Sequence, residues 1–221
     1  MVMSVNTSPG AMIALQSLTK TSNVLQTAQY RITTGLRVNG PKDDAATFAI
    51  AQNMRGDIAD MSTIKTNLGL GLSVTSVAID AGKAIADLLT EMKAKAVQAS
   101  QAGLSTDSYT ALNQEFTSLR AQLTTIVETA EFNGTNLITS IATDLAVLST
   151  VDGSTITVAA QSLDTTTLVL HTADLTAAAN ASQARVLIDT SITTVSNALA
   201  ALGSSAKRVE IQTEFTSKLQ D

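Results

Sequence analysis

The sequence predicts a mainly α fold: an elongated antiparallel bundle of long helices with a small β-hairpin insertion, plus an N-terminal helix. Three observations predict it. Near both ends of the chain, apolar residues recur at alternating spacings of four and three, which keeps one face of a helix against a partner. Aromatic residues make up only 3% of the chain, and the remaining apolar side chains suit closely spaced helices. A short Thr- and Val-rich stretch in the middle breaks the helical pattern.

The first helix is expected over residues 5–36, beginning near Pro9, whose fixed φ suits the first turn of a helix. Its apolar face, the N-terminal stripe, has six apolar residues among eight positions. The stripe consists of Ala11, Leu15, Leu18, Ser22, Leu25, Gln29, Ile32 and Leu36. Two glycines and a proline then interrupt the pattern, which predicts a connector over residues 35–42.

One long helix is expected between Asp43 and Gln101, with Asp43 and Asp44 placed to face the positive end of its dipole. Its apolar stripe runs through Ile50, Met54, Ile58, Met61, Ile64, Leu68 and Leu72, and continues through Val74, Val77, Ala81, Ile85, Leu88 and Met92. Four glycines interrupt it, namely Gly56, Gly69, Gly71 and Gly82. Each costs about 1 kcal/mol relative to Ala, so we expect a close backbone approach or a bend there.

A third helix is expected from the capping residues 105–107 to a stop signal at Asn133-Gly134. Its stripe is Tyr109, Leu112, Phe116, Leu119, Leu123, Ile126 and Ala130. The short turn before it predicts antiparallel packing on the long helix. Asp152-Gly153 between two β-like runs predicts a hairpin, and the β-branched residues 165–169 predict a third strand.

From about Ala177 the helical period returns and continues to the last residue. Seven apolar positions form the stripe of this helix, namely Ile188, Ile192, Val195, Leu199, Leu202, Ala206 and Val209. We expect this face to pack against the other long helices.

Composition argues against several classes of protein. A net charge of −5 with scattered Lys and Arg disfavours nucleic-acid binding. No run of 18 apolar residues is present, so no membrane-spanning segment is expected. The N-terminus lacks the charged and apolar regions of a cleaved signal peptide. There is no Cys and a single histidine, His171, which we expect at the surface; an enzyme, a metal site or a bound cofactor is therefore not expected.

Several stretches of the chain resemble bacterial flagellins. They are RITTGLRVNGPKDDAATFAI at 31–50, AVQAS at 96–100, EFNGTNLI at 131–138 and the C-terminal stretch at 187–203. The resemblance covers nearly the whole chain in matching order, and the first helix and the middle region are most similar to alphaproteobacterial flagellins.

The resemblance implies a structural subunit of the bacterial flagellar filament, which serves swimming motility. The implied partners are further copies of the chain in a helical homopolymer, an export chaperone or the secretion apparatus, and the filament cap. The implied location is extracellular, reached by type III export without a cleaved signal peptide. No enzyme activity is implied.

The resemblance also divides the chain. Residues 1–42 correspond to an inner-tube helix and its connector, 43–137 to rod-domain helices, 138–176 to the β insertion and 177–221 to a C-terminal rod helix. Relatives continue past the position of Asp221 into a helix that packs on the N-terminal one, so we expect either a shortened chain or a natural, assembly-defective product. Residues 1–40 are then expected to be mobile in the free chain.

Two sets of residues are expected to act in assembly. In the connector they are Gly35, Arg37, Lys42, Asp43 and Asp44, and in the N-terminal stripe they are Leu15, Leu18, Leu25 and Ile32. The Asp43-Asp44 pair is interpreted as helix-start charges, or as a salt link to Arg37 and Lys42, in preference to an acid–base pair.

A candidate immune-receptor patch is implied by the same resemblance, at Leu89, Glu91, Lys93 and Val97. Glu91 stands where relatives that an innate immune receptor recognises carry an arginine. Reversing a charge at a contact weakens recognition, so evasion of the receptor is expected. An ordinary solvated helix face explains Glu91 equally well.

Two alternatives remain open. A hook–filament junction protein shares the terminal helices, although its middle region is usually longer. A cytoplasmic helical signalling hairpin would continue its heptads through residues 144–170, where this sequence changes to a strand pattern. The many Ser and Thr between 139 and 172 fit either O-glycans or the preference of Thr for strands.

Overall fold

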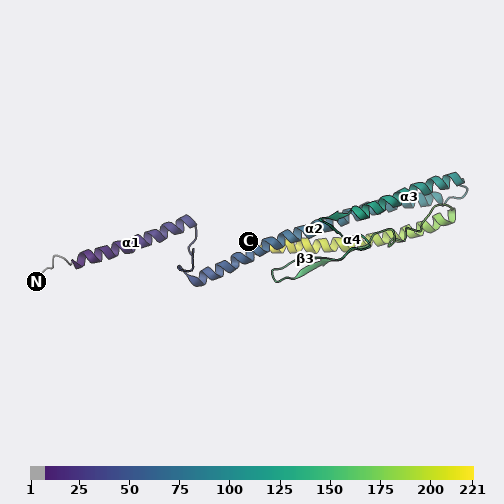
Figure 1. Cartoon of the computed structure of the whole chain (residues 1–221). Helices are drawn as coiled ribbons and strands as arrows, with labels where there is room; N and C mark the ends of the chain where they lie inside the picture. The colour runs from purple at the N-terminus through teal and green to yellow at the C-terminus, as the bar shows by residue number, and fades with distance from the viewer. Residues whose placement is uncertain (1–7) are drawn as a thin grey trace. The chain divides into compact units, whose positions relative to one another are not determined.

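The computed structural model describes residues 8–221 and confirms the mainly helical fold (Figure 1). The helices are α1 (Pro9–Thr34), α2 (Ala45–Ala99), α3 (Thr106–Thr129) and α4 (Ala178–Gln220). The strands are β1 (Glu131–Phe132), β2 (Thr135–Asn136), β3 (Leu145–Leu148) and β4 (Thr155–Val158). The chain divides into two compact units, one ending at Ile58 and the other spanning Ala59–Asp221.

The first unit contains α1, the connector and the first turns of α2. Ser8 caps α1 because its Oγ accepts a hydrogen bond from the main-chain N of Ala11 at 3.4 Å, and Pro9 occupies the first turn as predicted. Gly35 ends the helix in the left-handed region, with φ of 68°. Residues 5–7 of the predicted helix lie outside the described residues.

In the second unit, α3 and α4 both run antiparallel to α2 (Figure 1), which confirms the antiparallel bundle. The three helices share one apolar core. Among the predicted stripe residues that are completely buried are Leu68, Ile85, Met92, Phe116, Leu123, Ile188, Val195, Leu202 and Val209. Each such side chain stabilises the fold by roughly 1.5–3 kcal/mol. Large side chains outside the predicted stripes are also completely buried, among them Leu89, Leu137, Ile138, Leu163, Leu170 and Leu175.

Two of the four glycines in α2 allow close packing. A Cβ on Gly71 would lie 2.5 Å from Val147 Cγ2 of β3, and one on Gly82 would lie 2.8 Å from Leu199 Cδ2 of α4. A Cβ on Gly69 would meet nothing within 4 Å. The predicted close approach is therefore confirmed at Gly71 and Gly82, where only glycine leaves room for the facing side chain.

Both β pairs are antiparallel hairpins. Asp152-Gly153 lies in the turn between β3 and β4, as predicted, with Gly153 at φ of 88°. Asn133 and Gly134, predicted as a helix stop signal, form the tight turn between β1 and β2, with φ of 52° and 74°.

The predicted third strand at 165–169 is wrong. Residues 159–177, which we call the return segment, run back along the bundle to the start of α4 without strand pairing. Asp164 accepts hydrogen bonds from the main-chain N of Thr166 at 3.0 Å and of Thr167 at 3.4 Å, which folds a turn instead. Val169 follows at φ of 55°, a strained conformation for a β-branched residue.

Side chains of α3 hold the return segment in place. Arg120 Nη1 donates to three main-chain carbonyls within 170–173 at distances of 3.1, 3.2 and 3.3 Å. Asn113 Oδ1 accepts from the main-chain N of Leu175 at 2.8 Å. The segment has four buried leucines, so it closes the core between α3 and α4.

Two described helices, α2 and α4, are long and apolar enough to cross a membrane by length and composition, with windows of mean hydropathy 1.3. The absence of 18 consecutive apolar residues had predicted no such segment. In the most apolar 18-residue stretch of each helix, 39% of the residues are buried for α2 and 28% for α4. From Ile64 onward the predicted stripe of α2 packs in the core of the second unit together with the stripe of α4. The first part of the α2 stripe does not, because Ile50, Met54 and Ile58 are 61%, 59% and 43% exposed.

Replacing Gly71 by Ala is expected to destabilise the second unit, because the new methyl group would overlap Val147. Overpacking costs typically 1–3 kcal/mol, and the better helix propensity of Ala recovers about 1 kcal/mol. We expect a net loss of up to about 2 kcal/mol in the free energy of unfolding, measured by urea titration with circular dichroism. Gly69→Ala is the matched control and should stabilise by about 0.5–1 kcal/mol; equal stabilisation by both variants would contradict the packing described here.

Candidate assembly surface

The apolar face of α1 is exposed. The helix contains no buried residue, and Leu15, Leu18, Leu25 and Ile32 are 69%, 69%, 56% and 82% exposed. The same 4-3 pattern in α4 is buried in the core of its own unit. Within the first unit, as far as the structure describes it, the N-terminal stripe thus has no covering partner.

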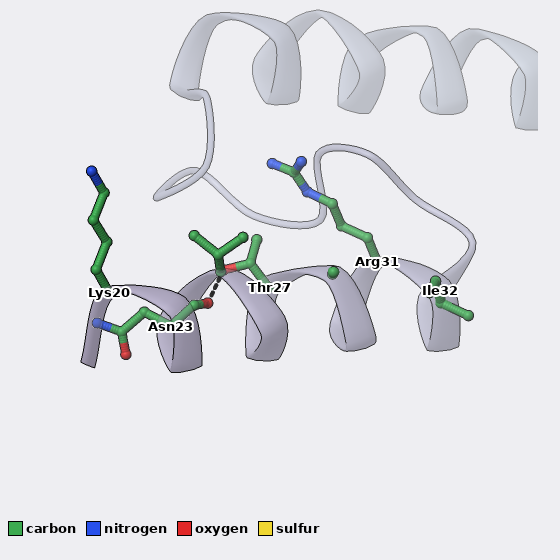
Figure 2. A pocket seen from close by; sticks show the side chains of 7 residues that line it. Lys20, Asn23, Thr27, Arg31 and Ile32 are labelled. Atoms are coloured by element: carbon green, nitrogen blue, oxygen red, sulfur yellow. Dashed lines mark hydrogen bonds between the residues drawn. The ribbon is translucent and has the colours of Figure 1, made fainter. Parts of the chain in front are cut away.

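An open groove of ≈ 640 Å³ follows one side of α1 (Figure 2). It is lined by Lys20, Asn23, Val24, Thr27, Ala28, Arg31 and Ile32. Lys20 and Arg31 are the charged residues of α1, which has no Asp or Glu, so the described helix carries two positive charges. The groove therefore combines apolar contact area with cationic groups near its two ends.

Asp44 caps the start of α2, which confirms its interpretation as a helix-start charge. Its Oδ1 accepts from the main-chain N of Ala46 and of Thr47, both at 3.1 Å, and its Oδ2 accepts from Thr47 Oγ1 at 2.6 Å. The hydrogen bonds from Thr47, side chain first, lower the pKa of Asp44, and the charge of Arg37 acts in the same direction.

Of the two interpretations of the Asp43-Asp44 pair, the helix-start charge is found at Asp44, and the salt link to Arg37 and Lys42 is not formed. None of the salt bridges formed within residues 8–221 includes either cation. Asp43 Oδ2 instead accepts from the main-chain N of Asn39 at 3.1 Å. Main-chain donors orient both carboxylates, while the exposed Arg37 and Lys42 remain in solvent.

Sequence reasoning missed one contact of the connector. Asn39 Nδ2 donates a hydrogen bond to Tyr30 Oη at 2.7 Å, which joins the connector to α1. Periodicity gives no signal for this pair, because Tyr30 lies outside the N-terminal stripe and Asn39 lies in the irregular stretch just before the turn at 40–43. The Asn39-Gly40 dipeptide marks the turn but not its partner.

The structure separates the members of the candidate immune-receptor patch. Leu89 is completely buried in the core, so it cannot contribute to a surface in this chain. Lys93 Nζ lies 2.6 Å from Asp189 Oδ1 of α4 in a salt bridge. Glu91 is exposed, and Val97 is 45% exposed, so these two and the partly exposed Lys93 remain at the surface.

Across 8–221, no group of three His, Cys, Asp or Glu side chains could hold a metal ion. His171 is exposed, and its main-chain carbonyl accepts one of the hydrogen bonds from Arg120.

Comparisons with known proteins identify the chain. Residues 5–143 match the family model described as bacterial flagellin N-terminal helical region. Flagellin FljO of Caulobacter vibrioides is 41% identical over 219 residues, which cover 99% of this chain and 80% of that protein. This relative, from an alphaproteobacterium, confirms the resemblance predicted above.

Two solved structures share the fold. The crystal structure of Bacillus cereus flagellin has a TM-score of 0.62 and 25% identity, covering 68% of this chain and 88% of that one. A putative flagellar hook-associated protein from Vibrio parahaemolyticus has a TM-score of 0.68, covering 82% of this chain and 96% of that one. Its identity is 12%, so the likeness concerns the fold alone. The family model over residues 5–143 and the high coverage of FljO show that this chain belongs to the bacterial flagellin family.

Proposed function

We propose that this flagellin, a structural subunit of the self-assembling bacterial flagellar filament, contacts neighbouring copies through the N-terminal stripe of α1. One observation carries the proposal: α1 contains no buried residue, although Leu15, Leu18, Leu25 and Ile32 lie on one face. Flagellins are structural proteins of the extracellular filament, and the surface proposed here is one of contact, without a catalytic role.

The energetics support covering of α1 by other copies. Fully burying one Leu or Ile stabilises a protein by roughly 1.5–3 kcal/mol relative to leaving it exposed. The N-terminal stripe has six apolar positions, so its burial would stabilise a polymer strongly. An isolated helix of this length is only marginally stable in water, so a contact that buries its stripe would also fold it.

The connector is proposed to set the position of one subunit relative to the next. Gly35 holds a left-handed conformation that other residues adopt with strain, and Asp44 fixes the start of α2. A connector bent in one defined way would present α1 to its neighbours in one register. Arg37, Lys42 and Asp43 are proposed to contribute through their exposed side chains.

Further partners are proposed from the family assignment: an export chaperone or the secretion apparatus, and the filament cap. Export without a cleaved signal peptide is part of this proposal. It is supported by the N-terminal sequence, which lacks a positively charged region followed by an apolar one.

We expect α1 to exchange its amide hydrogens rapidly in the free full-length chain, because it has no partner to fold against. The amides of Leu18, Leu25 and Ile32 should exchange within about tenfold of the unfolded rate. Those of Leu68 and Val195, in the core, should exchange at least about 10³-fold more slowly. Hydrogen exchange with mass spectrometry on monomer and filament measures both. Strong protection of α1 in the monomer would contradict the proposal, and so would a lack of added protection in the filament.

Replacing Leu25 by Gln should weaken assembly without changing the stability of the second unit. Loss of a buried leucine at a contact is expected to raise the critical concentration for polymerisation by about ten- to 100-fold. The control is Val186→Gln, which changes a residue of α4 that is 59% exposed and lies outside the proposed surface. Critical concentrations come from sedimentation of filaments. Equal effects of the two variants would exclude a specific role of the N-terminal stripe.

The candidate immune-receptor patch, reduced to Glu91, Lys93 and Val97, is proposed to activate the receptor weakly because Glu91 carries a negative charge. Glu91→Arg is expected to raise activation in a receptor-reporter assay at least about tenfold. Glu128→Arg, at an exposed residue of α3 that takes part in none of the salt bridges within residues 8–221, serves as a control for the change in net charge. Potent activation of the receptor by the unmodified chain would contradict this proposal.

A further inference from the structure

The bend between α1 and α2 is held by hydrogen bonds on both sides of Asn39. Its side-chain Nδ2 donates to Tyr30 Oη at 2.7 Å, and its main-chain N donates to Asp43 Oδ2 at 3.1 Å. Figure 2 shows the connector turning back over the C-terminal turns of α1. One residue therefore joins the last turns of α1 to the turn that precedes α2.

Other contacts shape the connector without reaching α1 beyond its last residue. The main-chain N of Asp43 donates to the carbonyl of Gly40 at 3.1 Å, and the main-chain N of Leu36 donates to Thr34 Oγ1 at 3.4 Å. Both bonds close short turns. Among the hydrogen bonds between described residues, the Tyr30–Asn39 bond spans the longest stretch of chain within the first unit, nine residues.

The Tyr30–Asn39 hydrogen bond can form only when two segments are folded, the end of α1 and the turn before α2. Tyr30 lies one helical turn before Thr34, so its hydroxyl reaches Asn39 only when the end of α1 is helical. Asn39 is placed only when residues 39–43 form their turn. Two segments that must both be folded for a bond to form will stabilise each other when it does.

We propose that Tyr30 and Asn39 are positioning residues that couple the folding of α1 to the bend of the connector. This inference rests on the proposed function, in which the connector sets the register between copies. When neighbouring copies fold α1, Tyr30 binds Asn39, and the connector then adopts the bend in which Asp43 and Asp44 meet their main-chain donors. Tyr30 thus acts through Asn39 and need not touch a neighbouring subunit.

The experiment measures how often the connector opens in assembled filaments. Tyr30→Phe, Asn39→Ala and the double variant are each copolymerised as a minor fraction with the unmodified full-length chain, so that filaments form in every case. Trypsin cleavage after Arg37 and Lys42 is followed by mass spectrometry, using an isotope label on the variant. Tyr109→Phe is the matched control, since Tyr109 is the other tyrosine and lies in the second unit.

Each single variant is expected to speed cleavage in the connector about two- to fivefold, the range for one exposed hydrogen bond. The double variant should be no faster than the singles, because both changes remove the same bond. A merely structural effect of either side chain would instead add in the double variant. Unchanged cleavage for Tyr30→Phe, additive effects, or an equal effect of Tyr109→Phe would each overturn the inference.

A second readout separates this inference from the proposed function. The critical concentration of each pure variant is measured beside that of the unmodified chain and is expected to rise about two- to fivefold. Faster cleavage with an unchanged critical concentration would support the coupling between α1 and the connector. It would contradict the proposal that the connector acts in assembly. Leu25→Gln tests the stripe independently of either result.

Discussion

The burial of small and branched apolar side chains between closely spaced helices holds the second unit together. Gly82 has no Cβ, so Leu199 of α4 can pack against the backbone of α2, and Leu163 of the return segment lies beside the same position. A core built in this way needs few aromatic residues, and in the described part of the chain Phe116 is the one phenylalanine that is completely buried. Close spacing makes each contact sensitive to added volume, which explains the glycines at positions 71 and 82 of a long helix.

Two helices with the same apolar period have opposite surroundings in this chain. In α4 the stripe is buried, with Val195 and Leu202 completely inaccessible, whereas Leu18 of α1 is 69% exposed. A 4-3 pattern predicts that a helix packs against a partner along one face. It does not indicate whether that partner belongs to the same molecule or to another copy. The exposure of α1 provides this missing information, and family membership supplies the neighbouring copies that would cover it.

The sequence predicted the parts of the fold that depend on local rules. Periodicity placed all four helices, and Asp152-Gly153 placed the hairpin between β3 and β4. Residues 165–169 were mistaken for a strand because β-branched residues favour strands, whereas Asp164 binds the following main-chain donors and folds a turn. In the candidate site, the stripe and the cap at Asp44 were predictable. The Tyr30–Asn39 bond was not, because it depends on how the connector folds back in space.

The way the return segment is anchored affects where a flagellin of this kind could accept an inserted segment. Arg120 and Asn113 anchor it independently of the hairpin tip, where residues 151–153 are exposed and connect two strands at their ends. Extra sequence placed at that tip would leave the core and the start of α4 unchanged, since exposed turns tolerate insertion. The bundle can thus serve as a constant scaffold to which a whole module is added at one exposed turn.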